Sequence, residues 1–171
     1  MNREDEEKLT MNRKHFSASI LALVTSLMVL PMAVAFADAP TPVSGTRVGS
    51  GPPRNVVRQE VGGNTIIRSE LTQIWTGGIS GTAELQRRQI NHPNGEFTTR
   101  ITATCVCTVD GVTGILYVNT QGNSDPNEQL FSGTWTITGG EGDLAGLHGQ
   151  GSVYQIFPAP SVYEGSLHFE P

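Results

Sequence analysis

Cys105 and Cys107 are the two thiols of this 171-residue chain, and their spacing limits the chemistry open to them. On an extended strand, side chains two residues apart share a face and lie about 6.7 Å apart along the chain. Because bridged Cβ atoms lie only about 3.8 Å apart, a disulfide needs a bulge or a distorted backbone. An exported protein allows an oxidised pair, and the alternative is two small core residues. The histidines His92, His148 and His168 show no ligand spacing with the pair, which argues against metal binding.

Carboxylates elsewhere in the chain form no catalytic or metal-binding pattern. Glu141 and Asp143 lie in an expected hairpin turn, and Asp125 and Glu128 lie in an expected loop. They could take up calcium, but turn chemistry itself favours acidic residues here, so solvated turn residues are the better interpretation. The chain contains no G-x-S-x-G nucleophile elbow and no phosphate-binding loop. We therefore expect no catalytic residue, no metal and no cofactor.

Polar and aromatic side chains on the inward faces of expected strands are the candidates for binding a small ligand. Gln73 shares a face with Trp75, and Gly133 and Gly165 share faces with aromatic residues and would leave space. Aromatic walls with a few convergent polar groups are typical of small-molecule sites. The alternative is that these groups satisfy one another inside a packed interior. The candidate ligand-binding residues are Gln73, Trp75, Arg87 and Tyr163.

The elements that must position these residues are strands. The chain has 20 glycines and 10 prolines, which disfavour long helices. Runs of β-forming residues between turn residues predict eight strands, at 55–61, 65–75, 80–90, 96–109, 112–119, 129–138, 147–157 and 161–169. In 96–109 the odd positions are mostly apolar and the even ones mostly polar, as a half-buried strand requires, whereas 80–90 shows no clear inner face. Asp110-Gly111 is a strong hairpin signal. The pattern predicts an all-β fold, an eight-stranded antiparallel meander closed into a β-barrel over residues 55–171.

The N-terminal residues 1–37 have the pattern of a signal peptide. A short basic stretch precedes the eleven-residue apolar run 20–30, and small residues then lead to an expected cleavage after Ala37. The run is too short for a membrane span, so we expect a secreted or periplasmic protein with no span after leader removal. The acidic first ten residues suggest that synthesis begins at Met11. Residues 38–54, rich in Pro and Gly, predict a flexible linker.

Two glycine-rich segments resemble a known family. Residues 131–151 read FSGTWTITGGEGDLAGLHGQG and residues 75–84 read WTGGISGTAE. They resemble a bacterial family known as a domain of unknown function and grouped with the allene oxide cyclase-like, or dirigent-like, eight-stranded barrels. The resemblance implies the fold and carries over no catalytic residue.

The function that we expect is non-catalytic binding of a small apolar or amphipathic ligand by an exported barrel. A cyclase or isomerase, or a structural, envelope-associated protein, are the alternatives. The net charge of −5 argues against nucleic acid as a partner. A homo-oligomer is compatible with the sequence.

Overall fold

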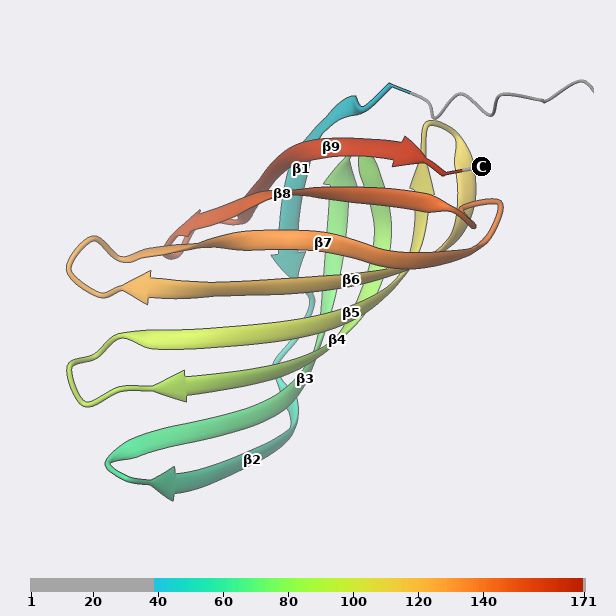
Figure 1. The fold of residues 1–171 in the computed structure, drawn as a ribbon. Coiled ribbons are helices and arrows are strands. Elements are labelled where there is room, and N and C mark those ends of the chain that lie inside the picture. Colours follow the sequence, from blue (N-terminus) through green and yellow to red (C-terminus); the bar gives the residue numbers. More distant parts are fainter. Residues whose placement is uncertain (1–38, 171) are drawn as a thin grey trace, which may run out of the picture. The chain divides into compact units, whose positions relative to one another are not determined.

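The computed structural model describes residues 39–170, which form a single antiparallel sheet of nine strands (Figure 1). The strands are β1 (Thr41–Gly49), β2 (Arg54–Val61), β3 (Asn64–Gly77), β4 (Ile79–Asn91), β5 (Phe97–Val109), β6 (Val112–Asp125), β7 (Leu130–Gly142), β8 (Leu147–Ile156) and β9 (Ser161–Phe169). Within residues 39–170 no helix is long and apolar enough to cross a membrane. The predicted signal peptide, residues 1–37, and the suggested start at Met11 lie outside the described residues.

Eight of the nine strands are hydrogen-bonded in a closed ring. From β3 to β9 every strand pairs with the next, as the meander predicts, and β1 pairs with β9. The ring closes where β1 also pairs with β3, from Gly45 opposite Gly77 to Gly49 opposite Gln73. The other half of the same β3 edge is occupied by β2, which has no further neighbour and therefore lies outside the ring.

The strand β1 corrects the prediction of a flexible linker over residues 38–54 and raises the strand count from eight to nine. Its prolines and glycines suggested irregular chain, yet Val43 and Arg47 are buried at alternate positions. Both edges of β1 are paired, with β9 from Thr41 onward and with β3. Backbone pairing on two sides outweighs the low intrinsic β-propensity of the segment.

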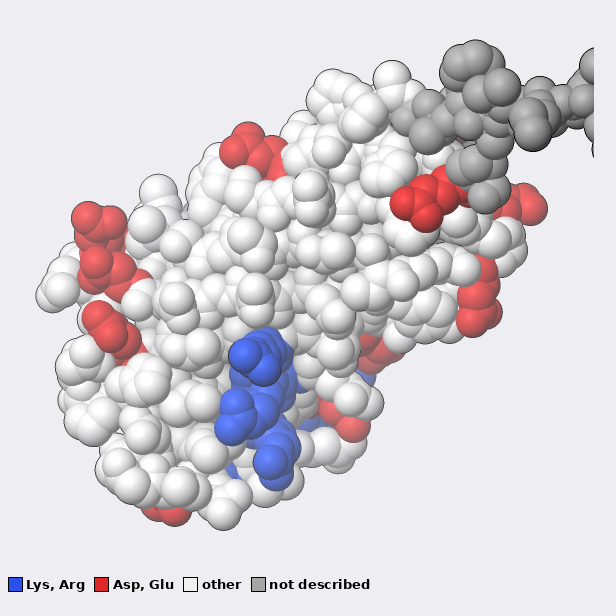
Figure 2. Space-filling model, in the orientation of Figure 1, with Lys and Arg blue, Asp and Glu red and all other residues white. Residues whose placement is uncertain are grey.

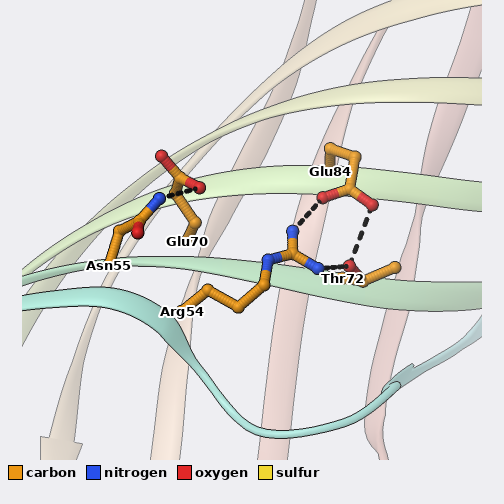
Figure 3. Close-up of polar contacts among 5 residues, drawn as sticks. All are labelled: Arg54, Asn55, Glu70, Thr72 and Glu84. Atoms are coloured by element: carbon orange, nitrogen blue, oxygen red, sulfur yellow. Dashed lines mark hydrogen bonds and ion pairs between the residues drawn. The ribbon is translucent and has the colours of Figure 1, made fainter.

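Polar side chains attach the start of β2 to the outer face of β3 and β4 (Figure 3). Arg54 donates to Thr72 Oγ1 at 2.9 Å and forms an ion pair with Glu84, while Thr72 Oγ1 donates to Glu84 Oε1 at 2.8 Å. These bonds from Thr72 and Arg54 lower the pKa of the Glu84 carboxyl. Asn55, with a φ of 50°, donates to Glu70 at 2.8 Å. Asn tolerates this left-handed conformation better than most residues.

The alternation read from the sequence is confirmed on the inner faces of the strands. Cys105, Cys107 and Val109 of β5 are buried, and the undecided strand β4 turns Ala83 and Leu85 inward. The predicted hairpin at residues 110–111 is also confirmed, since both turn residues have positive φ, 49° and 83°.

The inside of the ring is filled at one end only. The core occupies the end where β1 and β3 pair, with members such as Leu116, Val118, Ile137 and Leu167. At the other end are the connections β2–β3, β4–β5, β6–β7 and β8–β9, seen on the left of Figure 1. A layer formed by Arg47, Trp75, Trp135 and Tyr163 lies between the core and that end.

Candidate functional site

The unfilled end of the ring holds a cavity of about 140 Å³. Its walls are inward positions of β1 and β3–β9, and the exposed Phe157 of the β8–β9 connection marks its mouth. Phe97 stacks on Phe131 with ring centroids 6.1 Å apart and meets Phe157 edge-on at 6.4 Å. The lining residues are Arg47, Leu71, Gln73, Trp75, Leu85, Arg87, Gln89, Phe97, Thr99, Ile101, Ala103, Thr120, Phe131, Val153, Gln155, Phe157 and Ser161. The cavity is thus an apolar, partly aromatic chamber with a few polar groups.

Arg47 of β1 lies at the deep end of the cavity and is only 5% exposed. Its guanidinium carbon is 4.1 Å from the centroid of the Trp75 ring, 5.0 Å from that of Tyr163 and 5.9 Å from that of Trp135. Nη1 donates to Thr120 Oγ1, which also lines the cavity, at 3.3 Å. The cation is therefore held against three aromatic rings by one hydrogen bond.

The charge of Arg47 is incompletely compensated. Among the described residues, Nε and Nη2 have no hydrogen-bond partner, and no ion pair involves Arg47. Removing an ion from water costs several kcal/mol, whereas a desolvated cation–π contact contributes about 2 kcal/mol. Burial lowers the pKa of Arg47 to about 10, and the neighbouring Tyr163 hydroxyl works in the opposite direction. Arg47 is therefore charged at neutral pH and has no counter-ion among residues 39–170.

Arg87 is a second cation on the cavity wall. It is half-buried, and its Nε donates to Ser69 Oγ at 3.2 Å. Burial lowers its pKa. No carboxylate, histidine or thiol is among the described residues that line the cavity, so both cations face it without a negative charge in its wall.

Three of the four ligand-binding residues predicted from the sequence meet at this cavity: Gln73, Trp75 and Arg87. Trp75 Nε1 donates to Gln73 Oε1 at 3.1 Å, which orients the amide. Tyr163 lies behind the cavity instead. Its hydroxyl accepts from Ile79 N–H at 2.8 Å and donates to Ile79 O at 2.9 Å. Burial raises the pKa of this hydroxyl.

The space expected at Gly165 is filled by a neighbouring side chain, and so is not part of the cavity. A Cβ at Gly165 would meet the Gln150 carbonyl oxygen of β8 first and the Trp135 ring at 2.6 Å. Trp135 itself is 1% exposed, and its Nε1 donates to the carbonyls of Ser152 and Glu164 at 3.0 and 3.1 Å. This glycine therefore serves close packing of β9 on the tryptophan.

Cys105 and Cys107 are joined by a disulfide, with Cα atoms 5.3 Å apart. Their spacing in the sequence left open a disulfide or two separate core residues, and the structure has the disulfide. Both are buried in the core and neither lines the cavity. Neither sulfur is a free thiol nucleophile.

Outside the cavity, two histidines and a glutamate lie together near the end of β9. His148 and His168 stack at 5.8 Å, and their Nε2 atoms lie 3.4 and 3.7 Å from Glu170. Within residues 39–170 no group of three or more His, Cys, Asp or Glu side chains is arranged to hold a metal ion. We assign this cluster no chemistry.

Arginines also form a row on the outer face of the sheet. Arg68, Arg88 and Arg100 are exposed and lie directly opposite one another on β3, β4 and β5. Figure 2 shows basic side chains gathered in one patch over these strands. In the part of the chain that the structure describes, none of the three is in an ion pair. The row concentrates charge at the surface and, unlike Arg47, leaves it accessible to water.

Sequence reasoning missed Arg47 because it assigned this residue to a linker. The available signal was the tripeptide Ser-Gly-Thr, which occurs at Ser44, Ser80 and Ser132. In the structure all three copies lie in strands, β1, β4 and β7. Extending the pattern from the first copy would have placed Arg47 two residues beyond Gly45 on the inner face.

Comparison with known proteins identifies the family of this chain. The search of curated proteins found no match. The crystal structure of a protein with unknown function from the DUF3224 family of Shewanella oneidensis MR-1 matches with a TM-score of 0.65 and 21% identity. The match covers 78% of this chain and 99% of the other, and it shows that the two share a fold. The family model described as "Protein of unknown function (DUF3224)" matches residues 47–156, and the chain therefore belongs to the DUF3224 family.

Proposed function

We propose that this protein binds a small amphipathic organic molecule in the cavity of its strand ring. The observation that carries the proposal is the cavity itself, about 140 Å³ with aromatic walls and few polar groups. An engineered apolar cavity of about 150 Å³ is known to take up benzene, so a ligand with a ring of that size fits. The mouth at Phe157 gives the ligand a route of entry.

We further propose that the ring is a small β-barrel of the allene oxide cyclase-like kind. The eight ring-bonded strands and the glycine-rich segment of residues 131–151 support this assignment. Eight strands enclose just enough room for packed side chains or one small ligand.

Binding is favoured over catalysis by the composition of the cavity wall. General acid–base catalysis needs a group such as His, Glu or Asp within hydrogen-bonding reach of the substrate. The described lining residues offer amides, hydroxyls and two arginines, which hold and orient a ligand but do not exchange protons readily at neutral pH.

We propose export as the setting of this binding. The leader pattern of residues 1–37 supports it, and so does the disulfide between Cys105 and Cys107, because disulfides persist in oxidising compartments. N-terminal sequencing of the mature protein from its host tests this step, with Asp38 as the expected first residue. An intact leader on cytosolic protein would overturn it.

Calorimetric titration with benzyl alcohol tests the binding function. We expect one saturable site in the native protein. Ala103, which is buried and lines the cavity, is replaced by leucine to fill the site and abolish binding. Thr104→Leu on the outer face of the same strand is the matched control and should bind as the native protein does. If the native protein binds no benzene-sized probe, the interior is packed and its polar groups satisfy one another instead of a ligand.

A further inference from the structure

The least satisfied group in the described part of the protein is the guanidinium of Arg47. It is buried and charged, and two of its nitrogens have no hydrogen-bond partner. Buried charges in proteins are normally paired or hydrogen-bonded. Nη1 donates to Thr120 on the cavity wall, and Arg47 itself lines the cavity, so its guanidinium borders the space available to a ligand.

A negative ligand is also favoured by the charge of the whole wall. Arg47 and Arg87 both line the cavity, and no acidic side chain among the described residues lines it with them. The chain carries a net charge of −5, so a positive cavity is not a consequence of overall composition. Next to the low-dielectric interior of a protein, two cations attract an anion more strongly than they would in bulk water.

Resting on the proposed binding function, we propose that the natural ligand is a small organic carboxylate whose carboxylate pairs with Arg47. Arginine is suited to this because its planar N–H groups match the two oxygens of a carboxylate. Thr120 takes part as well. Its oxygen accepts from Arg47 Nη1, which leaves its O–H free to donate to the same anion.

The aromatic rings at the mouth define the rest of the ligand. Phe97, Phe131 and Phe157 surround the entrance, at the opposite end of the cavity from Arg47. A ligand with its carboxylate inward therefore places its apolar body against these rings. The cavity volume accommodates a body of about six carbon atoms, the size of a benzene ring.

Two probes of the same shape separate charge from fit. Benzoate carries the carboxylate, and benzamide is its neutral counterpart. By calorimetric titration we expect native protein to bind benzoate about 10- to 100-fold more tightly than benzamide, the range for hydrogen bonds to a charged group.

The variant Arg47→Met removes the charge and keeps a long apolar side chain. We expect it to lower benzoate affinity toward that of benzamide, with Arg87 still present, and to leave benzamide binding unchanged, which also shows that the cavity is intact. Arg88→Met in the outer row is the matched control and should change neither affinity. A second variant, Thr120→Val, should weaken benzoate selectively and by a smaller factor.

Each outcome is distinct. Equal affinity for benzoate and benzamide in native protein overturns the carboxylate proposal and leaves the binding function standing. Tight benzoate binding that survives Arg47→Met overturns the assignment to Arg47. Binding of neither probe defeats the proposed function itself. In native protein, a shift of the Arg47 side-chain NMR signals on adding benzoate but not benzamide gives an answer that depends on no variant.

Discussion

Replacing Arg47 by methionine should stabilise the ligand-free protein. Such a result is unusual for a core position, where most substitutions destabilise. The folded chain holds a cation that is only 5% exposed and has no ion-pair partner among the described residues. Methionine has a similar length, no charge and enough flexibility to fill an irregular space against aromatic rings.

The size of the gain follows from the contacts of the guanidinium. Burial lowers its pKa from the ordinary arginine value to about 10, and at about 1.4 kcal/mol for each pKa unit the buried charge costs about 3 kcal/mol. The close contact with Trp75, at 4.1 Å, offsets about 1–2 kcal/mol of this. We therefore expect Arg47→Met to raise the free energy of unfolding by about 1–2 kcal/mol, within the range found when buried charges are replaced by apolar residues.

The gain in unfolding free energy from Arg47→Met becomes smaller at high pH, where Arg47 loses its charge in the folded protein. Because burial lowers the pKa of Arg47 to about 10 in the folded protein, the unfolded state holds more protons from about pH 10 up to the ordinary arginine pKa, and stability from this residue recovers as the pH rises through that window. Below pH 10 the cost of the charge is present in full. The gain from Arg47→Met should accordingly be constant between about pH 6 and pH 9.

Urea unfolding followed by tryptophan fluorescence measures the effect, since Trp75 and Trp135 are both buried beside Arg47. Arg88→Met controls for the loss of an arginine at the surface. A loss of stability of about 1 kcal/mol or more in Arg47→Met, with an unchanged m-value, would mean that the aromatic contacts outweigh desolvation. Arg47 would then need no counter-anion in the folded protein.

Three further predictions concern the sheet around the site. Trp135→Ala should lower the free energy of unfolding by about 3–5 kcal/mol, because it empties a large buried site, and a near-neutral value in urea would contradict its place in the core. Arg88→Thr should stabilise by about 0.2–1 kcal/mol by relieving the arginine row, with a gain that shrinks in high salt; a gain independent of salt would contradict the electrostatic cause. Denatured protein should take up no iodoacetamide before reduction and two equivalents after it, counted by mass spectrometry, and labelling without reductant would disprove the bridge between Cys105 and Cys107.

Most of the sheet could be predicted from the sequence because its signals are local. The period-two pattern of residues 96–109 identifies the inner face of β5, and Asp110-Gly111 supplies the positive φ values of the next turn. Neither depends on the rest of the chain. The ring-bonded β1 has one local signal, its Ser-Gly-Thr tripeptide, and lacks a clear period-two pattern, since its stability comes from pairing with β9 and β3, which are remote in sequence.

In the candidate site, too, the residues on strands with local sequence signals could be predicted, and the residue on β1 was missed. Gln73, Trp75 and Arg87 lie on strands with visible periodicity, and the structure places all three on the cavity. Tyr163 was predicted on the right face but at the wrong depth, because the face of a strand does not tell how far along the ring a residue lies. Arg47 was missed because its segment was assigned to a linker, and its burial is produced by the closure of the ring.

The placement of Arg47 is hard to explain by stability alone. A ring of this size needs only apolar residues to fill its interior, and β1 already turns the apolar Val43 inward. Arg47 lies two inward positions beyond Val43, and its buried charge lowers stability unless something outside the chain compensates it. Proteins depart from favourable packing mainly where function requires it. Here the departure lies beside the one aromatic-walled cavity among the residues described, and an anion bound there would supply the missing partner of the arginine.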